Sequence, residues 1–540
     1  MLENVREKLS NSTPTPIQWL VASACILMVR FFLESLSNPS LSGMVASDAP
    51  TLVHYFLFFL SVGLALMLLL QFVLPTWKKA SPQLILLGLS ITSLPPIIDW
   101  VISGGKGLVM TYLIKSPADT ILSFLTFFGT DIFHGATIGI RVEVAIVIIG
   151  VGFIVYCVRK RIAMALFAMV MTYMIIFVAG SMPGIIAAIA SLVGDRSSTA
   201  VQFIQSSVLD SVTLSNNIHS TLRYATLVRM MEIGFDFLIG RVFYIITIGL
   251  SLAWFFTNYK EQVRSIFSNL RPERVGHYIF LVLLGVLIAY RQSSFVLNWN
   301  DWLSLLILLL AFFFSCMYAI SVNDVADVDI DNISNKGRPI PSGAISQYEM
   351  STVGILFLVS ALVAGYLSGY FAFFCILAFN ALYYIYSAPL TRFKRVPGLS
   401  AFIIGLCCLS AVLAGYFTFS SVKLVSSFPP ILIVGIVSIF FLAQHIKDLK
   451  DIDGDRAEGI MTIPTIFGPL WGGRIVGILT AASYFIVPFI ANNPALYFGA
   501  FPAAAATYMI ATRKPFREMP IFIVYGLFAI FLVVVLVIKI

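Results

Sequence analysis

The chain has 540 residues, of which 59% are hydrophobic and 11% are charged, and its mean hydropathy is +0.95. Soluble domains carry roughly 25% charged residues, so this composition excludes an ordinary soluble globular protein. Apolar runs of about 20 residues alternate with short polar loops, as in proteins that cross a membrane as helices. The net charge of +8 is typical of basic loops on one side of a membrane and requires no nucleic-acid partner. We therefore predict an all-α integral membrane protein.

The first half of the chain is expected to contain about six membrane helices. They lie near residues 17–36, 53–74, 83–102, 142–158, 162–193 and 235–257. The first run holds Arg30 and Glu34 and lacks a cleavage site of small residues, which favours a membrane helix over a cleaved signal peptide. Arg30 and Glu34 stand four residues apart, so we expect them to pair inside the bundle, in a structural or a functional role. Asp99, Arg141 and Glu143 are expected to be helix-end residues.

A polar linker separates the two halves. Thr257–Arg274, TNYKEQVRSIFSNLRPER, is the most polar linker in the chain and contains a proline. We therefore assign residues 1–265 to an N-terminal polytopic membrane domain and residues 275–540 to a second domain.

The second domain is expected to contain nine membrane helices. They lie near residues 278–291, 301–322, 351–370, 371–388, 397–418, 429–446, 474–491, 494–511 and 520–538. From Lys260 onward the chain has 19 Lys and Arg residues, and 16 of them fall on one side if the loops alternate across the membrane. Basic loops stay in the cytoplasm, so that side, with the acidic motifs described next, is expected to be cytoplasmic at the cell or inner membrane.

Two acidic motifs each follow an apolar segment of the second domain. The first, NDVADVDIDNISNKGRPIPSG, spans 323–343, and the second, IKDLKDIDGDRAEGIMTIP, spans 446–464. The spacing i, i+3, i+7 occurs twice, at Asp324, Asp327 and Asp331 and again at Asp448, Asp451 and Asp455. On a helix this spacing brings each triplet to one face within two turns.

Carboxylates gathered in this way repel one another unless a cation binds between them. Mg²⁺ relieves the repulsion, because it prefers oxygen ligands and keeps positions for water and substrate phosphates. Two facing triplets would hold a diphosphate through bound metal, and arginine and lysine side chains in the neighbouring loops would contact its oxygens. The pattern therefore favours a magnesium–diphosphate site that stabilises charge on a leaving group.

Three segments resemble the UbiA-type intramembrane prenyltransferases. NDVADVDID fits their NDxxDxxxD signature and is followed by the similar RPIPSG, and KDLKDIDGDRAEGIMTIPTIFG resembles their second aspartate motif. YYIYSAPLTR, at 383–392, resembles the YSxxLKR segment that ends their fourth helix. The motifs occur in order on the second, fourth and sixth of the nine expected helices. The resemblance covers about 275–540 and implies a nine-helix prenyltransferase bundle preceded by about six further transmembrane helices.

The resemblance implies Mg²⁺-dependent transfer of a polyprenyl group from an allylic polyprenyl diphosphate to a hydrophobic acceptor in the lipid bilayer. The implied metal ligands and catalytic residues are Asp324, Asp327, Asp331, Asp448, Asp451 and Asp455, with Tyr386 near the reacting carbon. The implied diphosphate-binding residues are Asn323, Lys336, Arg338, Arg392, Lys394, Lys447 and Arg456. Asn380 would also line the cleft. Thr391 stands where the family usually has lysine, so the role of that lysine is either missing here or taken by Lys394.

Several alternatives stay open at this stage. The acceptor would be a quinone-type aromatic ring, a glycerol-phosphate ether lipid, a tetrapyrrole or a sugar phosphate, and we favour the first two. Capture of the allylic cation by water or by an internal double bond would make the protein a diphosphate hydrolase or a terpene cyclase. A cation-binding or transport protein would carry its acidic residues at mid-helix facing a pore, whereas these lie at helix ends beside bases. The N-terminal domain would deliver or shape the acceptor, mediate assembly or hold a second activity.

Overall fold

The computed structural model describes residues 2–37, 49–108, 112–113, 117–129, 136–193, 220–293, 297–396, 398–450, 452–457 and 461–538. Every regular element in these ranges is a helix, and fifteen helical segments are long and apolar enough to cross a membrane. The predicted all-α, multi-pass membrane protein is thereby confirmed. The chain divides into two compact units, Met1–Lys260 with Leu297–Ser304, and Glu261–Val296 with Leu305–Ile540.

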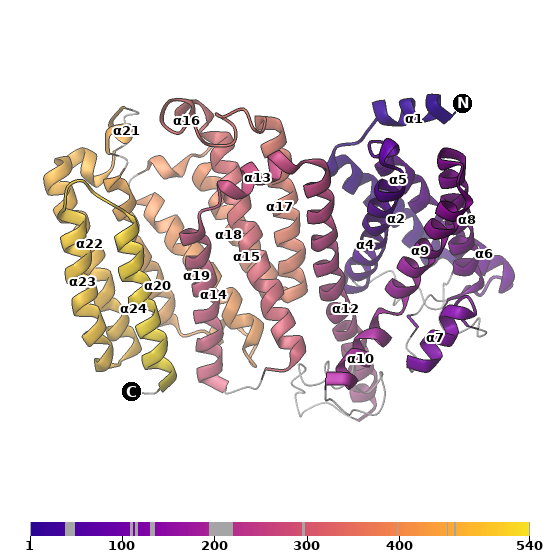
Figure 1. Ribbon diagram of the computed structural model, residues 1–540. Coiled ribbons are helices and arrows are strands. Elements are labelled where there is room, and N and C mark those ends of the chain that lie inside the picture. Colours follow the sequence, from indigo (N-terminus) through magenta and orange to yellow (C-terminus); the bar gives the residue numbers. More distant parts are fainter. Residues whose placement is uncertain are drawn as a thin grey trace. The chain divides into compact units, whose positions relative to one another are not determined.

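Six of the candidate membrane spans lie in the first unit, the number expected from hydropathy. Figure 1 shows its long helices in indigo to magenta. Its helices are α1 (Leu2–Asn11), α2 (Pro16–Ser37), α4 (Ala49–Val73), α5 (Ser81–Ile91), α6 (Leu94–Ile102), α7 (Pro117–Leu125), α8 (Ile138–Arg159), α9 (Ile162–Gly180), α10 (Met182–Val193) and α12 (Ser220–Asn258).

Two of the spans expected in this unit are broken into pairs of helices. The span expected at 83–102 is interrupted between α5 and α6, directly before Pro95 and Pro96, and the run expected at 162–193 is interrupted at Ser181, before Pro183. Proline has no backbone N–H and clashes with the preceding turn, so it is tolerated at the first helical positions but not in a helix interior. The breaks therefore follow from the positions of the prolines.

Two buried charged groups in the first unit, Arg30 and Asp99, have polar partners. Arg30, which is 1% exposed, lies 3.7 Å from Glu34 and 3.5 Å from Glu143, and the expected Arg30–Glu34 pair is confirmed. Asp99 accepts hydrogen bonds from the Thr137 hydroxyl at 2.6 Å and from the backbone N–H of Gly139 at 2.8 Å. Asp99 thus caps the start of α8, which is the helix-end role expected for it.

Nine candidate spans belong to the part of the chain from Pro272 onward, again the number expected. The helices are α13 (Lys260–Ser268), α14 (Pro272–Ser293), α15 (Trp299–Ala326), α16 (Val328–Ser334), α17 (Gln347–Ser368), α18 (Tyr370–Ser387), α19 (Leu399–Phe419), α20 (Pro430–Ala443), α21 (Ile452–Ala457), α22 (Ile463–Ala491), α23 (Tyr497–Thr512) and α24 (Met519–Ile538). Short 3₁₀ turns lie at η1 (Pro75–Trp77), η2 (Phe393–Arg395), η3 (Val425–Ser427), η4 (Gln444–Leu449) and η5 (Pro494–Leu496).

The close approach of α14 and α19 sets the centre of the second unit. A Cβ on Gly285 would lie 2.0 Å from the carbonyl oxygen of Val412, and a Cβ on Gly415 would lie 2.0 Å from that of Val282. Glycine on both helices lets the two backbones meet, as at other close helix crossings in membranes. The short helices α16 and α21 carry parts of the two acidic motifs, and both lie at the same end of this unit (Figure 1).

Candidate active site

The first acidic motif lies across the junction between α15 and α16. Asn323 and Asp324 are in the last turn of α15, Asp327 lies between the helices, and Asp331 is in α16. The backbone N–H of Asp327 donates to the carbonyl of Asn323 at 3.0 Å, and that of Asp331 donates to the carbonyl of Asp327 at 2.9 Å. The helical hydrogen-bond pattern therefore continues through the junction. The three aspartates are buried, with 2%, 8% and 2% exposure.

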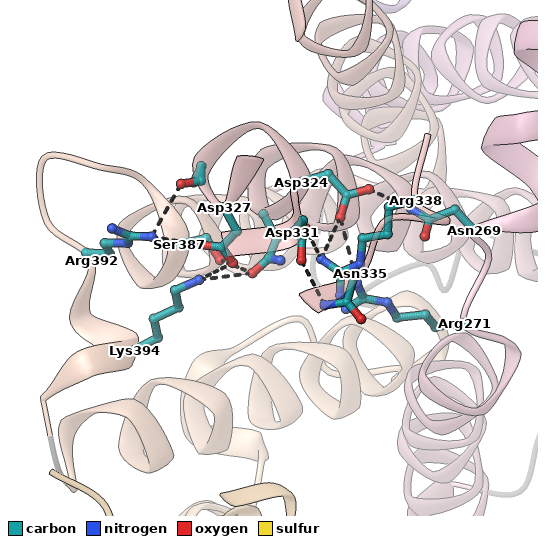
Figure 2. Close-up of polar contacts among 12 residues, drawn as sticks. Asn269, Arg271, Asp324, Asp327, Asp331, Asn335, Arg338, Ser387, Arg392 and Lys394 are labelled. Carbon is teal, nitrogen blue, oxygen red and sulfur yellow. Dashed lines mark hydrogen bonds and ion pairs between the residues drawn. The ribbon is translucent and has the colours of Figure 1, made fainter. Parts of the chain in front are cut away.

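Asp324 and Asp331 share one arginine. The Arg338 guanidinium donates to Asp331 and lies 3.5 Å from Asp324. Asn269 donates to Asp324 at 2.6 Å, and Arg271 lies 3.7 Å from the same carboxylate. Figure 2 shows these side chains converging on one side of the motif. Buried carboxylates are stable when they are paired and hydrogen-bonded, and this cluster meets that condition.

Asp327 points to a second set of cations. The Arg392 guanidinium donates to it at 2.8 Å, Lys394 donates to its other oxygen, and Lys394 also lies 3.4 Å from the amide oxygen of Asn323. Burial by itself raises the pKa of Asp327, but Lys394 and Arg392 outweigh burial and hold that pKa below the usual carboxyl value. The single face of three carboxylates expected from the spacing is thus divided into two clusters (Figure 2).

The second acidic motif is described in part. Lys447 and Asp448 lie in η4, and Asp448 is 3.6 Å from the ring of His445. Asp455 and Arg456 lie in α21, where Arg456 is exposed. The predicted ligand Asp451 lies outside the described residues.

Two cavities of the second unit are lined in part by residues of the motifs. The larger has a volume of about 250 Å³, and its wall is formed mainly by apolar and aromatic side chains of α14, α18, α20, α22 and α24. The smaller, of about 50 Å³, has Asn323 and Arg271 in its wall. Four residues line both cavities, namely Arg274, Tyr278, Tyr383 and Tyr386. We call these four residues the neck, because they lie in the walls of both cavities.

Tyr386 connects the second motif to the neck. The Lys447 ammonium donates to the Tyr386 hydroxyl, and Lys447 also lines the larger cavity. The other two tyrosines of the neck are joined by a hydrogen bond of 2.6 Å between the hydroxyls of Tyr278 and Tyr383. The predicted position of Tyr386 beside a cleft thus agrees with its place in the walls of both cavities.

Two residues expected at the site make no contact with its charged groups among the residues that the structure describes. Asn380 is 2% exposed and donates to Ser315 at 2.9 Å and to the carbonyl of Ile376 at 2.8 Å, and it lines neither cavity. Its role is to join α15 and α18, because a buried amide in an apolar bundle needs partners. Lys336 is exposed and has no ion pair or hydrogen bond among the residues that the structure describes.

The structure distinguishes Thr391 from Lys394. The Thr391 hydroxyl donates to the carbonyl of Ile385 at 2.7 Å and so caps the end of α18, whereas Lys394 reaches Asn323 and Asp327. We therefore expect Lys394→Gln to reduce turnover of an allylic diphosphate at least about tenfold, as for loss of one charge-assisted hydrogen bond. Thr391→Val is the matched control and should stay within about twofold of the unchanged protein. Equal turnover by the two variants would contradict this assignment.

Sequence reasoning missed three residues of the site. Asn269, Arg271 and Arg274 lie in the segment NLRPER, which was interpreted only as a polar linker. Burial lowers the pKa of the Arg271 guanidinium to about 10, an effect that the nearby Arg274 and Arg338 reinforce and that Asp324 and Asp331 oppose. Arg271 is therefore charged at neutral pH. The signal in the sequence was the cluster of side chains that donate hydrogen bonds, which stands directly before the first membrane helix of the second domain.

The donor set of the first motif allows a test of whether magnesium fits. Carboxylate and amide oxygens are the ligands that Mg²⁺ prefers. Among the described residues, however, no three acidic, histidine or cysteine side chains converge closely enough to hold a metal ion by themselves. Their neighbours are arginine and lysine side chains, which bind phosphate. The carboxylates therefore supply the type of ligand that magnesium prefers, but among the described residues they do not form a complete metal site by themselves.

Part of the chain is similar to a known protein family. Residues 278–536 match the model of the UbiA prenyltransferase family. A relative is the digeranylgeranylglyceryl phosphate synthase of Methanocaldococcus jannaschii, 30% identical over 188 residues, which are 34% of this chain and 62% of that protein. Another is the chloroplastic chlorophyll synthase of Arabidopsis thaliana, 35% identical over 161 residues, or 28% of this chain and 40% of that protein. The chain thus spans less than two thirds of either relative.

The chain is also similar to proteins whose structures have been solved. A UbiA homologue from Archaeoglobus fulgidus bound to GPP and Mg²⁺ is 20% identical, covers 51% of this chain and 99% of its own, and has a TM-score of 0.38. A digeranylgeranylglyceryl phosphate synthase structure is 21% identical, with coverage of 51% and 96% and a TM-score of 0.36. The similarity to the UbiA prenyltransferase family therefore covers residues 278–536 of this chain.

Proposed function

We propose that the protein transfers a polyprenyl group from an allylic polyprenyl diphosphate to a membrane-associated acceptor. The observation that carries the proposal is the junction of two unlike compartments. The first motif, with its buried carboxylates and four basic side chains around them, shares the smaller cavity with the neck, and the neck also lines a largely apolar cavity of about 250 Å³. A molecule with an anionic head and a hydrocarbon tail has the complementary chemistry.

The basic residues of the first motif would bind the diphosphate head. Arg338, Arg392 and Lys394 are already held in position by the aspartates, so little side-chain freedom would be lost when a substrate binds. Lys447 would approach from the second motif, since its ammonium group lines the larger cavity. Mg²⁺ shared between aspartate and phosphate oxygens would supply further neutralisation of the leaving group.

The tyrosines of the neck would surround the carbon that reacts. When the bond between C1 of the prenyl group and the bridging oxygen breaks, the electron pair leaves with the diphosphate and positive charge develops on the allylic carbons. The electron-rich faces of Tyr278, Tyr383 and Tyr386 attract a cation. A nucleophilic atom of the acceptor then forms the new bond to C1, and the acceptor loses a proton.

The class of the acceptor is supported only in outline. The relatives are named for a glyceryl phosphate lipid and for chlorophyll, so both lipid and ring acceptors occur among similar proteins. An apolar cavity that opens near charged loops suits either class. A hydrolase or cyclase remains the second candidate function, because the tyrosine-lined neck would serve any reaction of an allylic cation.

The test uses the full chain in oriented vesicles with radiolabelled geranylgeranyl diphosphate, with and without Mg²⁺, and a lipid extract from the native host. We expect Mg²⁺-dependent release of diphosphate and movement of the label into one lipid. The proposed cytoplasmic position of the motifs, based on the bias of 16 among 19 basic residues, predicts that the impermeant donor is consumed only from that side.

Other outcomes decide between the alternatives. Label found only in a free alcohol or hydrocarbon would replace the transferase with a hydrolase or a cyclase. Absence of both binding and turnover with allylic diphosphates of several lengths would overturn the proposed function.

A further inference from the structure

Arg274 occupies the meeting point of the two cavities. It is the third residue of α14 and is the cationic member of the neck, whose other members are tyrosines. The smaller cavity is lined by Arg274 together with Asn323 of the first motif and Arg271 of the linker, and the larger is lined by Arg274 together with Lys447 of the second motif. A group bound beside Arg274 would therefore be within reach of both motifs.

Within the described ranges, Arg274 differs from the other bases that contact the site in having no hydrogen-bond or ion-pair partner. Arg338, Arg392 and Lys394 each donate to an aspartate, Arg271 lies beside one, and Lys447 donates to a phenol. The guanidinium of Arg274, by contrast, makes no hydrogen bond or ion pair with any residue that the structure describes.

Arg274 is exposed, so water solvates its charge, and few groups in the cavity walls would compete with a bound ligand for it. The smaller cavity is lined otherwise by apolar, aromatic and small side chains, together with Asn323 and the cationic Arg271. The carboxylate in the wall of the larger cavity is that of Glu518, which lies 3.7 Å from Lys450. An unpaired guanidinium in such a wall is complementary to an anion, and its planar fork matches phosphate oxygens.

We infer that Arg274 is a substrate-binding residue that binds a phosphate group at the neck. The inference rests on the proposed function and deepens it. The phosphate would come either from the diphosphate of the donor or from the head group of a phosphate-bearing lipid acceptor. Arg274 precedes the segment that matches the family, 278–536, so the family match does not assign this residue.

The two sources give different kinetic signatures in Arg274→Gln and Arg274→Lys variants of the full chain. Binding of geranylgeranyl diphosphate and of inorganic diphosphate is measured without turnover, and KM is measured separately for geranylgeranyl diphosphate and for geranylgeranylglyceryl phosphate. Loss of one charge-assisted hydrogen bond corresponds to a change of about tenfold in a binding constant or in KM. We expect Arg274→Gln to change the binding constant or KM by at least this factor, either for the donor diphosphate or for the glyceryl phosphate. Arg274→Lys should recover part of the loss.

Arg264→Gln is the matched control, because Arg264 lies ten residues earlier, is 60% exposed and pairs only with the exposed Glu261. Weaker donor and diphosphate binding in Arg274→Gln would assign Arg274 to the donor. A raised KM for the glyceryl phosphate alone would assign it to the acceptor.

The inference is overturned if the unchanged protein turns over the donor and Arg274→Gln has the same binding constants and KM values as Arg264→Gln. If the unchanged protein itself neither binds nor consumes the donor, the proposed function fails instead, and the two failures are distinguishable.

Discussion

Asp324→Asn is expected to reduce prenyl transfer by about 10²- to 10³-fold, the loss seen when one preorganised charge-stabilising group is removed from an active site. Asp324 is 2% exposed and is contacted by Asn269, Arg271 and Arg338. Asparagine has the same shape but no charge, so it would weaken both the orientation of the two arginines and any shared metal binding. The measurement is the initial rate of diphosphate release from labelled donor at saturating Mg²⁺.

Asp329→Asn provides the matched control for this substitution. Asp329 lies five residues further along the same motif, is exposed, and has no hydrogen bond or ion pair among the described residues. We expect its rate to stay within about twofold of the unchanged protein. Comparable losses in both variants, with both proteins folded, would mean that the charge of the loop matters and that the position of Asp324 does not.

Gly285→Ala is expected to destabilise the second unit more than other single substitutions of glycine in α14. The added Cβ would lie 2.0 Å from the carbonyl oxygen of Val412 and 2.8 Å from the backbone nitrogen of Tyr416. Both obstacles are backbone atoms of α19, so a side-chain rotation cannot relieve the clash and the helices must separate. Overpacking of this kind costs about 1–3 kcal/mol or more, and each kcal/mol lowers Tm by roughly 2–4 °C.

Gly276→Ala is the control in the same helix, because a Cβ at Gly276 has no heavy atom within 4 Å. Both substitutions add the same helix propensity, about 1 kcal/mol relative to glycine, so the difference between their Tm values isolates the steric effect. Thermal unfolding of the purified proteins in detergent gives the comparison. A Tm for Gly285→Ala equal to that for Gly276→Ala would show that α14 and α19 are not packed at this distance.

The membrane class and the number of spans could be predicted because they depend on local composition. Each span needs only a run of apolar residues long enough for the bilayer, and both sets of spans, six and nine, were recovered. The breaks at Ser181 and before Pro95 were missed, although proline was the visible signal, because hydropathy alone joins two short helices into one span. The aspartates of the first motif were found because the helical hydrogen-bond pattern, and with it their spacing, continues across the junction between α15 and α16.

The partners of those aspartates could not be predicted in the same way. Arg392 and Lys394 reach Asp327 across 65 and 67 residues, and Asn269 reaches Asp324 across 55. Such pairings depend on which helix ends lie together. For the same reason Asn380 was expected in the cleft but is buried between α15 and α18, while Arg274 in the linker lines both cavities.

The sequence by itself therefore determined that this is an all-α membrane protein and located its first acidic motif, because hydropathy and the i, i+3, i+7 spacing are local properties of the chain. Only the tertiary structure decided how that motif is used. It divided the three aspartates between two sets of cations and gathered the three tyrosines with Arg274 at the neck. The physical reason is that ion pairs and cavity walls form between side chains from different helices, and their positions follow from helix packing, as at Gly285 and Gly415.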